Sequence, residues 1–455
     1  MKVLKFGGSS VATPDRVKSV IQIVKPYLGG EPVAIVFSAF GGVTDQLIRT
    51  ARLAVAWDKS YQQQLAQIEE RHLEAVKSLV AVQHQSSVLA HVKVTIHELE
   101  DVLQGIYLVG ELTARTLDFV MSFGERLSAY IIAAAFRDAK IDAEYLDART
   151  VVRSDKNFGY ARIDFEKTND QISRHFAQAK SLQVITGFIA STEEGETTTI
   201  GRSGSDYTAA IFARALNATS LEIWTDVDGM MTADPRKVKR AFTVPEMTYE
   251  EAMELSHFGA KVIFPATMKP AMETHIPIWI KNTFNPSFPG TCISTQSGNG
   301  MLIKGISSVN NISLLNIQGT GLLGVVGVSM RLFTALANEK VNVILISQAS
   351  SEHSICLAVE GASAAAARRA IELEFQYEIR AGEMDHVHAE DNLAIVAVVG
   401  EHMKHNPGTS GRMFHALGKN GVNVSAIAQG SSELNISAVI RESDVAKALN
   451  ALHEA

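Results

Sequence analysis

Glycines lie directly beside charged and hydroxyl side chains in several segments, a combination suited to phosphate binding. In Lys5-Phe-Gly-Gly-Ser-Ser, an apolar run delivers Lys5 to a glycine pair. Backbone N–H groups at Gly7, Gly8 and Ser9 could close around an anion at a helix start, and Lys5 would add a point charge. The alternative, a plain turn with a solvated lysine, is equally compatible with these residues alone. The Walker A pattern is absent.

A second segment, Ser38-Ala-Phe-Gly-Gly-Val-Thr44-Asp45, has the same form. Ser38 follows another apolar run, so it is expected at a strand end, and polar residues follow the glycines at the start of a helix. Taken alone, Thr44 and Asp45 are better explained as the cap of a helix.

Two further segments carry side chains suited to an amino acid or phosphate. Glu125 lies in Phe-Gly-Glu-Arg-Leu-Ser, where a first-turn glutamate favoured by the helix dipole is the simpler interpretation. In Gly201-Arg-Ser-Gly-Ser-Asp206, Arg202 could hold a carboxylate, and Ser205 and Asp206 could order phosphates or a metal. An arginine between glycines is unusual for a simple cap, which favours a functional role.

The run Thr225-Asp226-Val-Asp-Gly resembles half of a calcium loop, but the twelfth position from Asp226 is Lys237 where an EF-hand needs glutamate. A nucleotide loop containing Thr225, Asp226 and Arg236 is the better interpretation. Lys261, after Phe-Gly-Ala, could meet phosphate or cap a helix.

Other candidate sites are weaker. Gly319-Thr-Gly-Leu-Leu-Gly fits a dinucleotide fingerprint, but the following strand ends in Gln348 and not in the required acid. No two of His72, His84, His91 and His97 are spaced i, i+4, so solvated or partly buried histidines are expected and no metal site from protein ligands is predicted.

The elements that must position these residues form an open α/β sheet. Strands are expected at Val3–Phe6, Val33–Ser38, Leu182–Thr186 and Leu221–Thr225, and a helix from about Asp15. Strands that run into glycine turns and helices place ligands at the carboxyl ends of the sheet. Residues 45–120, almost free of Gly and Pro, predict a pair of long helices.

The C-terminal part contains an internal repeat. A shift of 81 residues aligns 311–359 with 392–440 without a gap and gives 17 identities in 49 positions. Both copies contain Gln-x-Ser-Ser-Glu, at Gln348 and at Gln429. Two units are few for a solenoid, so a pair of small α+β modules is expected.

Composition limits the classes of protein. The 455 residues suggest two to four domains, and 46% hydrophobic with 20% charged residues is typical of globular chains. A net charge of -7 argues against nucleic acid as a partner. Two cysteines exclude a disulfide framework. With no leader-like start and no apolar run near ~20 residues, a cytoplasmic protein without a membrane span is expected.

Taken together, six segments in order resemble the aspartate kinases of the amino acid kinase superfamily. The matching runs are KFGGSSVA, SAFGGVTD, SFGERLS, GRSGSDYTAA, WTDVDGMMTADPR and FGAKVIFPAT. The repeated modules resemble ACT regulatory domains, and SQASSE and AQGSSE are similar to the threonine-responsive branch. Asp45 and Met231 depart from the Asn and Tyr that many members carry there, and Ser9-Ser10 is a milder variation.

The resemblance implies a fold: an amino acid kinase domain at 1–297 and ferredoxin-like ACT modules at 311–385 and 386–455. A strand near 303–310 would complete the second module. It also implies the first step of the aspartate pathway to lysine, threonine, methionine and diaminopimelate. In that step ATP, with Mg²⁺, phosphorylates the side-chain carboxylate of L-aspartate.

The resemblance further implies site residues. Catalytic roles are expected for Lys5, Arg202 and Asp206, and substrate binding for Thr44, Glu125, Arg202 and Ser205. The expected ATP site comprises Lys5, Gly7, Gly8, Ser9, Ser38, Thr225, Asp226, Met231, Arg236 and Lys261.

Regulation is expected at Gln348 and Gln429, with Asn342 and Asn423 as weaker candidates. Threonine is the expected effector, lysine the second, and the modules are expected to pair in a homodimer or higher oligomer. Two alternatives stay open: another amino acid kinase, of the glutamate or acetylglutamate type, and a non-enzymatic amino-acid sensor.

Overall fold

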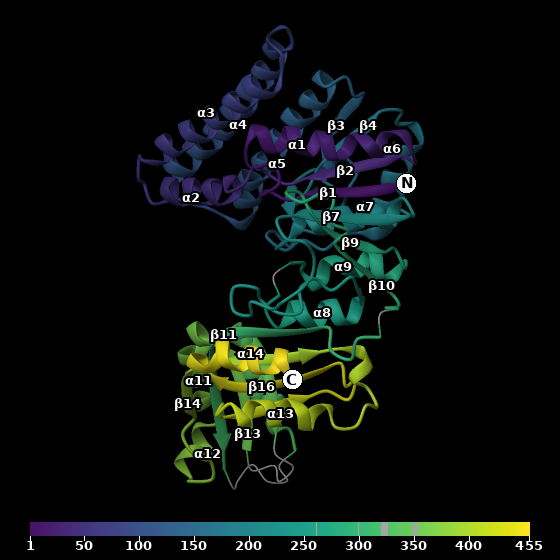
Figure 1. Ribbon diagram of the computed structural model, residues 1–455. Coiled ribbons are helices and arrows are strands. Elements are labelled where there is room, and N and C mark those ends of the chain that lie inside the picture. Colours follow the sequence, from purple (N-terminus) through teal and green to yellow (C-terminus); the bar gives the residue numbers. More distant parts are fainter. Residues whose placement is uncertain (261, 299, 320–325, 349–353) are drawn as a thin grey trace. The chain divides into compact units, whose positions relative to one another are not determined.

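The computed structural model describes residues 1–260, 262–298, 300–319, 326–348 and 354–455 (Figure 1). It contains two compact units. The first consists of Met1–Met230, Pro245–Tyr249 and Val262–Gly298, and the second of Met231–Val244, Glu250–Lys261 and Asn299–Ala455. The predicted α/β fold followed by a second sheet-rich region is confirmed.

An eight-stranded sheet organises the first unit. Neighbouring strands are parallel except for β9 and β10. In spatial order the strands are β3 (Ala143–Leu146), β4 (Leu182–Thr186), β2 (Val33–Phe37), β1 (Lys2–Phe6), β7 (Ser220–Thr225), β9 (Ile278–Asn282), β10 (Thr291–Ser294) and β8 (Glu246–Thr248).

The central strands are continuous apolar runs because both faces of the sheet are covered. Every residue of β2 and β4 is buried, and only Lys2 of β1 is partly exposed. Phe6 lies opposite Phe37 and Trp224 in the register, and its ring stacks on both at 5.6 and 5.8 Å. The four strands predicted from the sequence are confirmed.

Helices and short elements cover the sheet and connect its strands (Figure 1). The helices are α1 (Pro14–Val24), α2 (Val43–Val55), α3 (Tyr61–Leu79), α4 (Val82–Val109), α5 (Ala114–Asp138), α6 (Phe165–Gln178), α7 (Gly204–Ala215) and α9 (Pro265–Glu273). The short elements are η1 (Lys25–Gly29), η2 (Ala148–Thr150), β5 (Ile189–Ser191) and β6 (Thr197–Thr199).

The prediction of two long helices over 45–120 was wrong, because α2, α3, α4 and the start of α5 share this range. Two of the breaks lie where the sequence has neither glycine nor proline. Trp57 adopts a positive φ of 56° after α2, and the extended pair Val80–Ala81 separates α3 from α4. Sequence composition could not show these breaks, because they depend on the backbone of ordinary residues.

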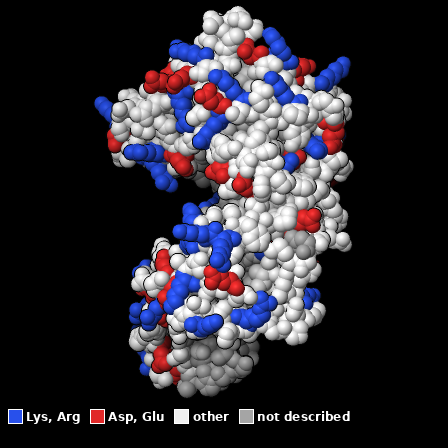
Figure 2. All heavy atoms as spheres, in the orientation of Figure 1, with Lys and Arg blue, Asp and Glu red and all other residues white. Residues whose placement is uncertain are grey.

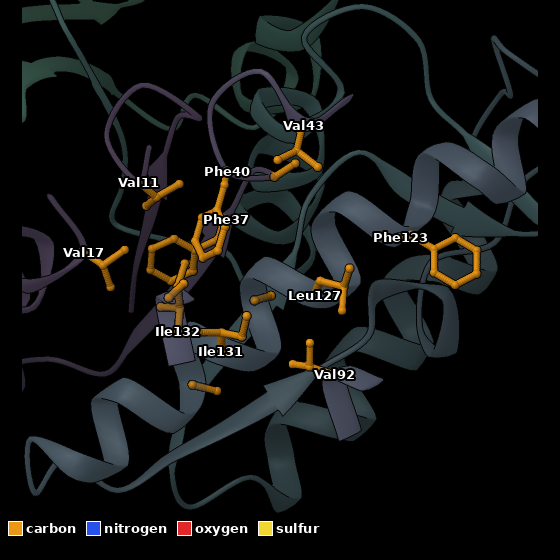
Figure 3. Packing of buried hydrophobic residues seen from close by; sticks show 14 of the residues in the cluster. Val11, Val17, Phe37, Phe40, Val43, Val92, Phe123, Leu127, Ile131 and Ile132 are labelled. Atoms are coloured by element: carbon orange, nitrogen blue, oxygen red, sulfur yellow. The ribbon is translucent and has the colours of Figure 1, made fainter. Parts of the chain in front are cut away.

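Helix α5 lies at the centre of the main core cluster (Figure 3). Among the described residues it is the one helix long and apolar enough to cross a membrane, and 83% of its most apolar window is buried inside the protein. The buried helix of a domain core passes the same test. His72 was predicted to be solvated or partly buried, and this prediction was wrong, because its side chain is fully buried.

The second unit is built on a six-stranded sheet with the order β12-β13-β11-β14-β16-β15. Its strands are β11 (Gly305–Gln318), β12 (Val343–Gln348), β13 (Ser354–Glu360), β14 (His388–Val399), β15 (Ala426–Gln429) and β16 (Asn435–Arg441). Its helices are α8 (Tyr249–His257), α10 (Val328–Asn338), α11 (Gly361–Glu374), α12 (Gln376–Arg380), α13 (Thr409–Lys419) and α14 (Val445–Glu454), with short turns η4 (Glu401–Met403) and η5 (Glu442–Asp444).

The sequence repeat is a structural repeat. Asn311 and Asn392, identical in the aligned copies, both have positive φ (58° and 59°). Gly327 and Gly408 also have positive φ (93° and 91°), and they precede α10 and α13. Asparagine and glycine tolerate this left-handed backbone best, which explains why these identities recur. The glycine-rich stretch considered as a dinucleotide fingerprint falls mostly on 320–324, outside the described residues.

Strand β11 serves both copies of the repeat. Its first part, Gly305–Val309, pairs with Ile395–Val399 of β14, and its second part, Ile312–Gln318, pairs with β13. The edge strands β12 and β15 also meet, because the Ser347 hydroxyl donates to the Ile427 carbonyl at 2.9 Å. The strands of the two copies therefore belong to one six-stranded sheet.

Candidate active site

The carboxyl ends of parallel strands meet at one edge of the first unit's sheet. Two glycine loops leave this edge: the first glycine loop, residues 7–12, follows β1, and the second glycine loop, residues 38–42, follows β2. The segment after β7 begins at the same edge with Asp226. The predicted candidates of the first unit therefore gather where an open α/β sheet binds ligands.

Lys5 and Asp206 form an ion pair at this edge. Lys5 Nζ lies 2.6 Å from Asp206 Oδ1, and both side chains are about 10% exposed. Asp206 Oδ1 is buried, and among the described residues the ammonium of Lys5 is its polar partner. A Cβ at Gly7 would lie 3.4 Å from Lys5 Nζ, in ordinary van der Waals contact, so Gly7 lies directly beside the ammonium.

The first glycine loop is anchored to neighbouring strands. The Gly7 N–H donates to the Trp224 carbonyl (3.1 Å), so it is occupied and does not point to a ligand. Ser10 Oγ contacts the same carbonyl at 3.3 Å and Thr283 Oγ1 at 2.7 Å. Among the described residues, the amides of Gly8 and Ser9 meet no acceptor. Those two N–H groups are the ones available to an anion.

The second glycine loop packs on the middle of α5, where Glu125 lies. Glu125 is therefore not in a first helical turn, and that simpler interpretation was wrong. A side chain at Gly124 would meet the Ala39 Cβ at 2.9 Å, so glycine allows the close approach. The Ala39 N–H donates to Glu125 Oε1 at 3.2 Å, and Ser128 Oγ donates to the Ser38 carbonyl at 2.9 Å.

Glu125 has an unusual protonation behaviour. Burial raises the pKa of its carboxyl to about 8, and the Ala39 hydrogen bond and the charge of Lys5 oppose that rise. Its Oε2 atom is buried and has no hydrogen-bond partner within the described part of the chain. An acceptor of this kind fits a cationic ligand group that would restore the charged form.

The remaining substrate candidates lie around the starts of α2 and α7. Thr44 and Asp45 follow the actual cap, Gly42, which has a positive φ of 83°, so they are not the cap themselves. Arg202 is exposed, and no ion-pair partner among the described residues holds it. Ser205 and Asp206, in the first turn of α7, are both buried.

At the end of β7, Thr225 Oγ1 donates to Asp226 Oδ1 at 3.2 Å. Asp228 Oδ1 accepts from the amides of Asn282 (2.9 Å) and Asn285 (3.1 Å), so this carboxylate ties two loops together. Within the described residues, no group of three His, Cys, Asp or Glu is arranged to hold a metal.

Not all predicted residues belong to this unit. Met231 and Arg236 lie in the second unit, where Arg236 forms a two-point pair with Asp234 at 3.0 and 2.9 Å. Lys261 lies outside the described residues. Gln348 and Gln429 are exposed at the ends of β12 and β15, and Asn342 and Asn423 are exposed just before those strands.

Sequence reasoning missed Asp118, a fully buried carboxylate on α5. It accepts from the Gly159 N–H (2.8 Å), the Thr199 N–H (2.9 Å) and Thr199 Oγ1 (2.7 Å). Burial raises the pKa of Asp118, and these hydrogen bonds counter the rise. Through Thr199 it supports the loop that carries Arg202. An acid inside an apolar helix was the signal available in the sequence.

Comparison with known proteins shows which family the chain resembles. Residues 1–282 match the model of the amino acid kinase family, and residues 315–375 and 396–455 match an ACT domain model. A bifunctional aspartokinase/homoserine dehydrogenase 1 of Arabidopsis thaliana is 38% identical over 99% of this chain and 50% of that protein. The chain thus spans about half the length of its bifunctional relatives.

Other relatives match over more of their length. The aspartokinase 1 of Arabidopsis thaliana is 34% identical over 99% of this chain and 79% of that protein. The crystal structure of Escherichia coli aspartokinase III with aspartate and ADP has 28% identity and a TM-score of 0.84, covering 100% of this chain and 99% of that chain. The aspartate kinase of Clostridium acetobutylicum, also 28% identical with the same coverage, has a TM-score of 0.81.

The amino acid kinase model covers more than half of the chain. The Arabidopsis aspartokinase 1 and the two solved structures named above are all aspartokinases. The open α/β sheet and the repeated modules agree with that assignment. The chain belongs to the amino acid kinase family and, within it, to the aspartokinases.

Proposed function

We propose that the protein is an aspartate kinase. It transfers the γ-phosphoryl group of ATP to the side-chain carboxylate of L-aspartate and yields 4-phospho-L-aspartate and ADP. This is the first step of the aspartate pathway. The observation that carries the proposal is the buried Lys5–Asp206 pair at the sheet edge where both glycine loops begin. The structurally similar Escherichia coli enzyme was solved with aspartate and ADP, which supports the choice of substrates.

The chemistry suits these residues because the nucleophile needs no general base. A side-chain carboxylate with an ordinary pKa of about 3.9 is ionised at neutral pH. The obstacle is repulsion between this anion and the polyanionic triphosphate. Catalysis therefore consists of positioning and charge neutralisation, as in phosphoryl transfer generally.

Lys5 neutralises charge on the transferring phosphoryl group, and the free amides of Gly8 and Ser9 bind phosphate oxygens. Asp206 fixes the ammonium of Lys5. The Asp206 carboxylate also offers oxygen atoms of the kind that would hold the Mg²⁺ that accompanies ATP. Ser38, Thr225 and Asp226 line the nucleotide site, while the nucleotide roles of Met231, Arg236 and Lys261 stay predictions from the sequence.

Glu125 binds the substrate ammonium and Arg202 its α-carboxylate, while Thr44 and Ser205 orient the side chain. Two opposite charges at fixed separation would select an α-amino acid. Glu125 meets this need because its Oε2 is buried and unpaired among described residues. The exposed guanidinium of Arg202 offers a planar fork for the carboxylate.

We further propose that the second unit is regulatory. An amino acid binds beside Gln348 and Gln429, with threonine as the expected effector and lysine the second, and the modules pair in a homodimer. The first part of β11 completes the second module. The Escherichia coli relative was also solved with lysine and aspartate, which supports an amino-acid effector. Both cysteines are free, which fits the cytoplasm.

The test is an ATP-turnover assay with aspartate, glutamate and acetylglutamate as acceptors, for wild type and Lys5→Ala. We expect turnover with aspartate only. Lys5→Ala should lower kcat by orders of magnitude and change the KM for aspartate far less. Preference for glutamate or acetylglutamate would favour the other amino acid kinases, and the absence of all turnover would favour the amino-acid sensor.

A further inference from the structure

Arg71, on α3, touches both glycine loops. Its Nη2 atom donates to the Ala12 carbonyl (3.1 Å) in the first loop and to the Gly41 carbonyl (2.8 Å) in the second. No carboxylate pairs with it among the described residues. Burial lowers the pKa of this guanidinium, although an arginine stays charged at neutral pH. A partly buried cation is thus held by backbone carbonyls alone.

The two loops meet with almost no space between them. A Cβ at Gly41 would lie 3.0 Å from the Gly8 carbonyl and 3.0 Å from the Ala12 Cβ, and one at Gly8 would lie 3.1 Å from the Ala39 carbonyl. Backbone therefore packs on backbone. Because each loop rests on the other, a shift of one would displace the other.

The residue next to Arg71 strengthens the contact between α3 and the second loop. The His72 ring stacks on Phe40, with centroids 5.3 Å apart and planes 25° apart. His72 is fully buried, and its Nδ1 meets the Ile68 carbonyl at 2.6 Å, which fixes the ring. Figure 3 shows Phe40 and Val43 among the same buried apolar side chains as Val11. Helix α3 is thus a support common to both loops.

We propose that Arg71 is a positioning residue that fixes the distance between phosphoryl donor and acceptor. This inference rests on the proposed function, in which the first loop binds ATP phosphates and the second adjoins the aspartate site. Because one guanidinium nitrogen of Arg71 binds both loops, the position of α3 sets the distance between them. Because phosphoryl transfer depends on alignment, a displacement of about 1 Å lowers the rate by roughly 100-fold. The same bridge makes nucleotide and aspartate binding interdependent.

The test uses Arg71→Met, which keeps the stem and removes the bridge, and Arg71→Lys, which keeps the charge. Lys77→Met is the matched control, because Lys77 is exposed on the same helix. In Arg71→Met we expect kcat to fall at least tenfold, with the KM of each substrate changed less than threefold. Arg71→Lys should regain part of the loss, and Lys77→Met should equal wild type.

A second measurement does not depend on turnover or on a variant. Hydrogen exchange of the wild-type protein should show that ADP alone slows exchange in residues 39–43, which follow Ser38 in the second loop and to which the proposed function assigns no nucleotide contact. Arg71→Met should bind ADP without this effect. Kcat within twofold of wild type in a folded Arg71→Met, or no slowing at 39–43 in the wild type, would overturn the inference. Failure to bind ADP, or binding without aspartate turnover, would instead refute the proposed function.

Discussion

Glu125 shows how one buried carboxyl links folding, ligand binding and pH. With a pKa raised to about 8, it is mostly neutral at pH 7 in the free protein. In the proposed site the substrate ammonium favours the charged form of Glu125, so we expect aspartate binding below pH 8 to release a proton. The contribution of Glu125 to the free energy of unfolding has the opposite pH dependence, because the folded protein holds the proton more tightly than the unfolded chain. This contribution is fully present below pH 4.5 and is lost as pH rises through about 8.

We therefore expect aspartate affinity, measured by calorimetry without ATP, to rise between pH 6.5 and pH 8, by up to about tenfold per pH unit. Proton release should appear as a dependence of the heat on the buffer. Glu125→Gln should bind aspartate weakly and lose this pH dependence, whereas Glu100→Gln, at an exposed position of α4, should behave as wild type. A wild-type affinity that is flat over this range would refute an ammonium contact at Glu125.

The residue scale also shows what sequence alone reached. The motifs predicted Lys5, Asp206 and Glu125, because glycines and charges stand together in the chain. They did not indicate that the Gly7 N–H is already bound to Trp224, because that contact joins residues 217 positions apart. Arg71 and Asp118 were missed for the same reason. Their partners are brought together by packing of helices, which no local pattern records.

At the scale of elements, β7 and β9 support the first glycine loop through a buried polar cluster. Glu222, only 3% exposed, accepts from Tyr27 Oη (2.7 Å) and Trp224 Nε1 (3.1 Å) and pairs with Lys281 Nζ (3.1 Å). Burial and the adjacent Glu222 raise the pKa of Tyr27. The Trp224 carbonyl in turn holds Gly7 and Ser10, so the cluster fixes the strand on which the loop is anchored.

Removal of one partner from a buried ion pair leaves a charge without compensation. Lys281→Met should therefore lower the free energy of unfolding by about 3 kcal/mol. The matched Lys269→Met, where the exposed lysine lies 3.8 Å from Glu273, should change it by less than about 0.5 kcal/mol. Denaturant titration measures both, and equal effects would contradict this account. Combining Lys281→Met with Glu222→Gln should recover part of the loss.

Elements were predicted unevenly. Strands β1, β2, β4 and β7 were predicted correctly because burial on both faces makes them continuous apolar runs, whereas β3, β8, β9 and β10 were not predicted. The helices between 43 and 138 were not, because Trp57 and Val80–Ala81 break them with ordinary residues. The repeat was recognised from identities at Asn311, Gly327 and their counterparts, whose backbone conformation limits the residue type.

At the scale of the whole molecule, acidic and basic side chains are interspersed on the face shown in Figure 2. This pattern fits the small net charge of -7, which gives the chain no strong long-range electrostatic field of one sign. We therefore expect the small zwitterionic ligands of the proposed function to be recognised by local groups. The exposed Gln348 and Gln429 offer such groups at the ends of strands that contact each other through Ser347 and Ile427.

Threonine, titrated first, should inhibit aspartate phosphorylation by the wild type, and lysine is titrated next as the second expected effector. Gln348→Ala and Gln429→Ala should relieve inhibition and leave the uninhibited kcat nearly unchanged, because a glutamine amide both donates to and accepts from an amino acid. Gln62→Ala, exposed on α3, should remain sensitive. Insensitivity of the wild type to both amino acids would mean that the glutamines are structural.

The shared strand β11 also bears on how the chain is made. Gly305–Val309 finds its partner at Ile395–Val399, some ninety residues later. At about 5–20 residues per second on the ribosome, this segment waits roughly 5–20 seconds for that partner. During the wait its backbone N–H and C=O groups lack their β14 partner and are open to the wrong neighbour. We therefore expect that the two modules of the second unit cannot fold one after the other. A chaperone would protect this unit most while the chain is still being synthesised.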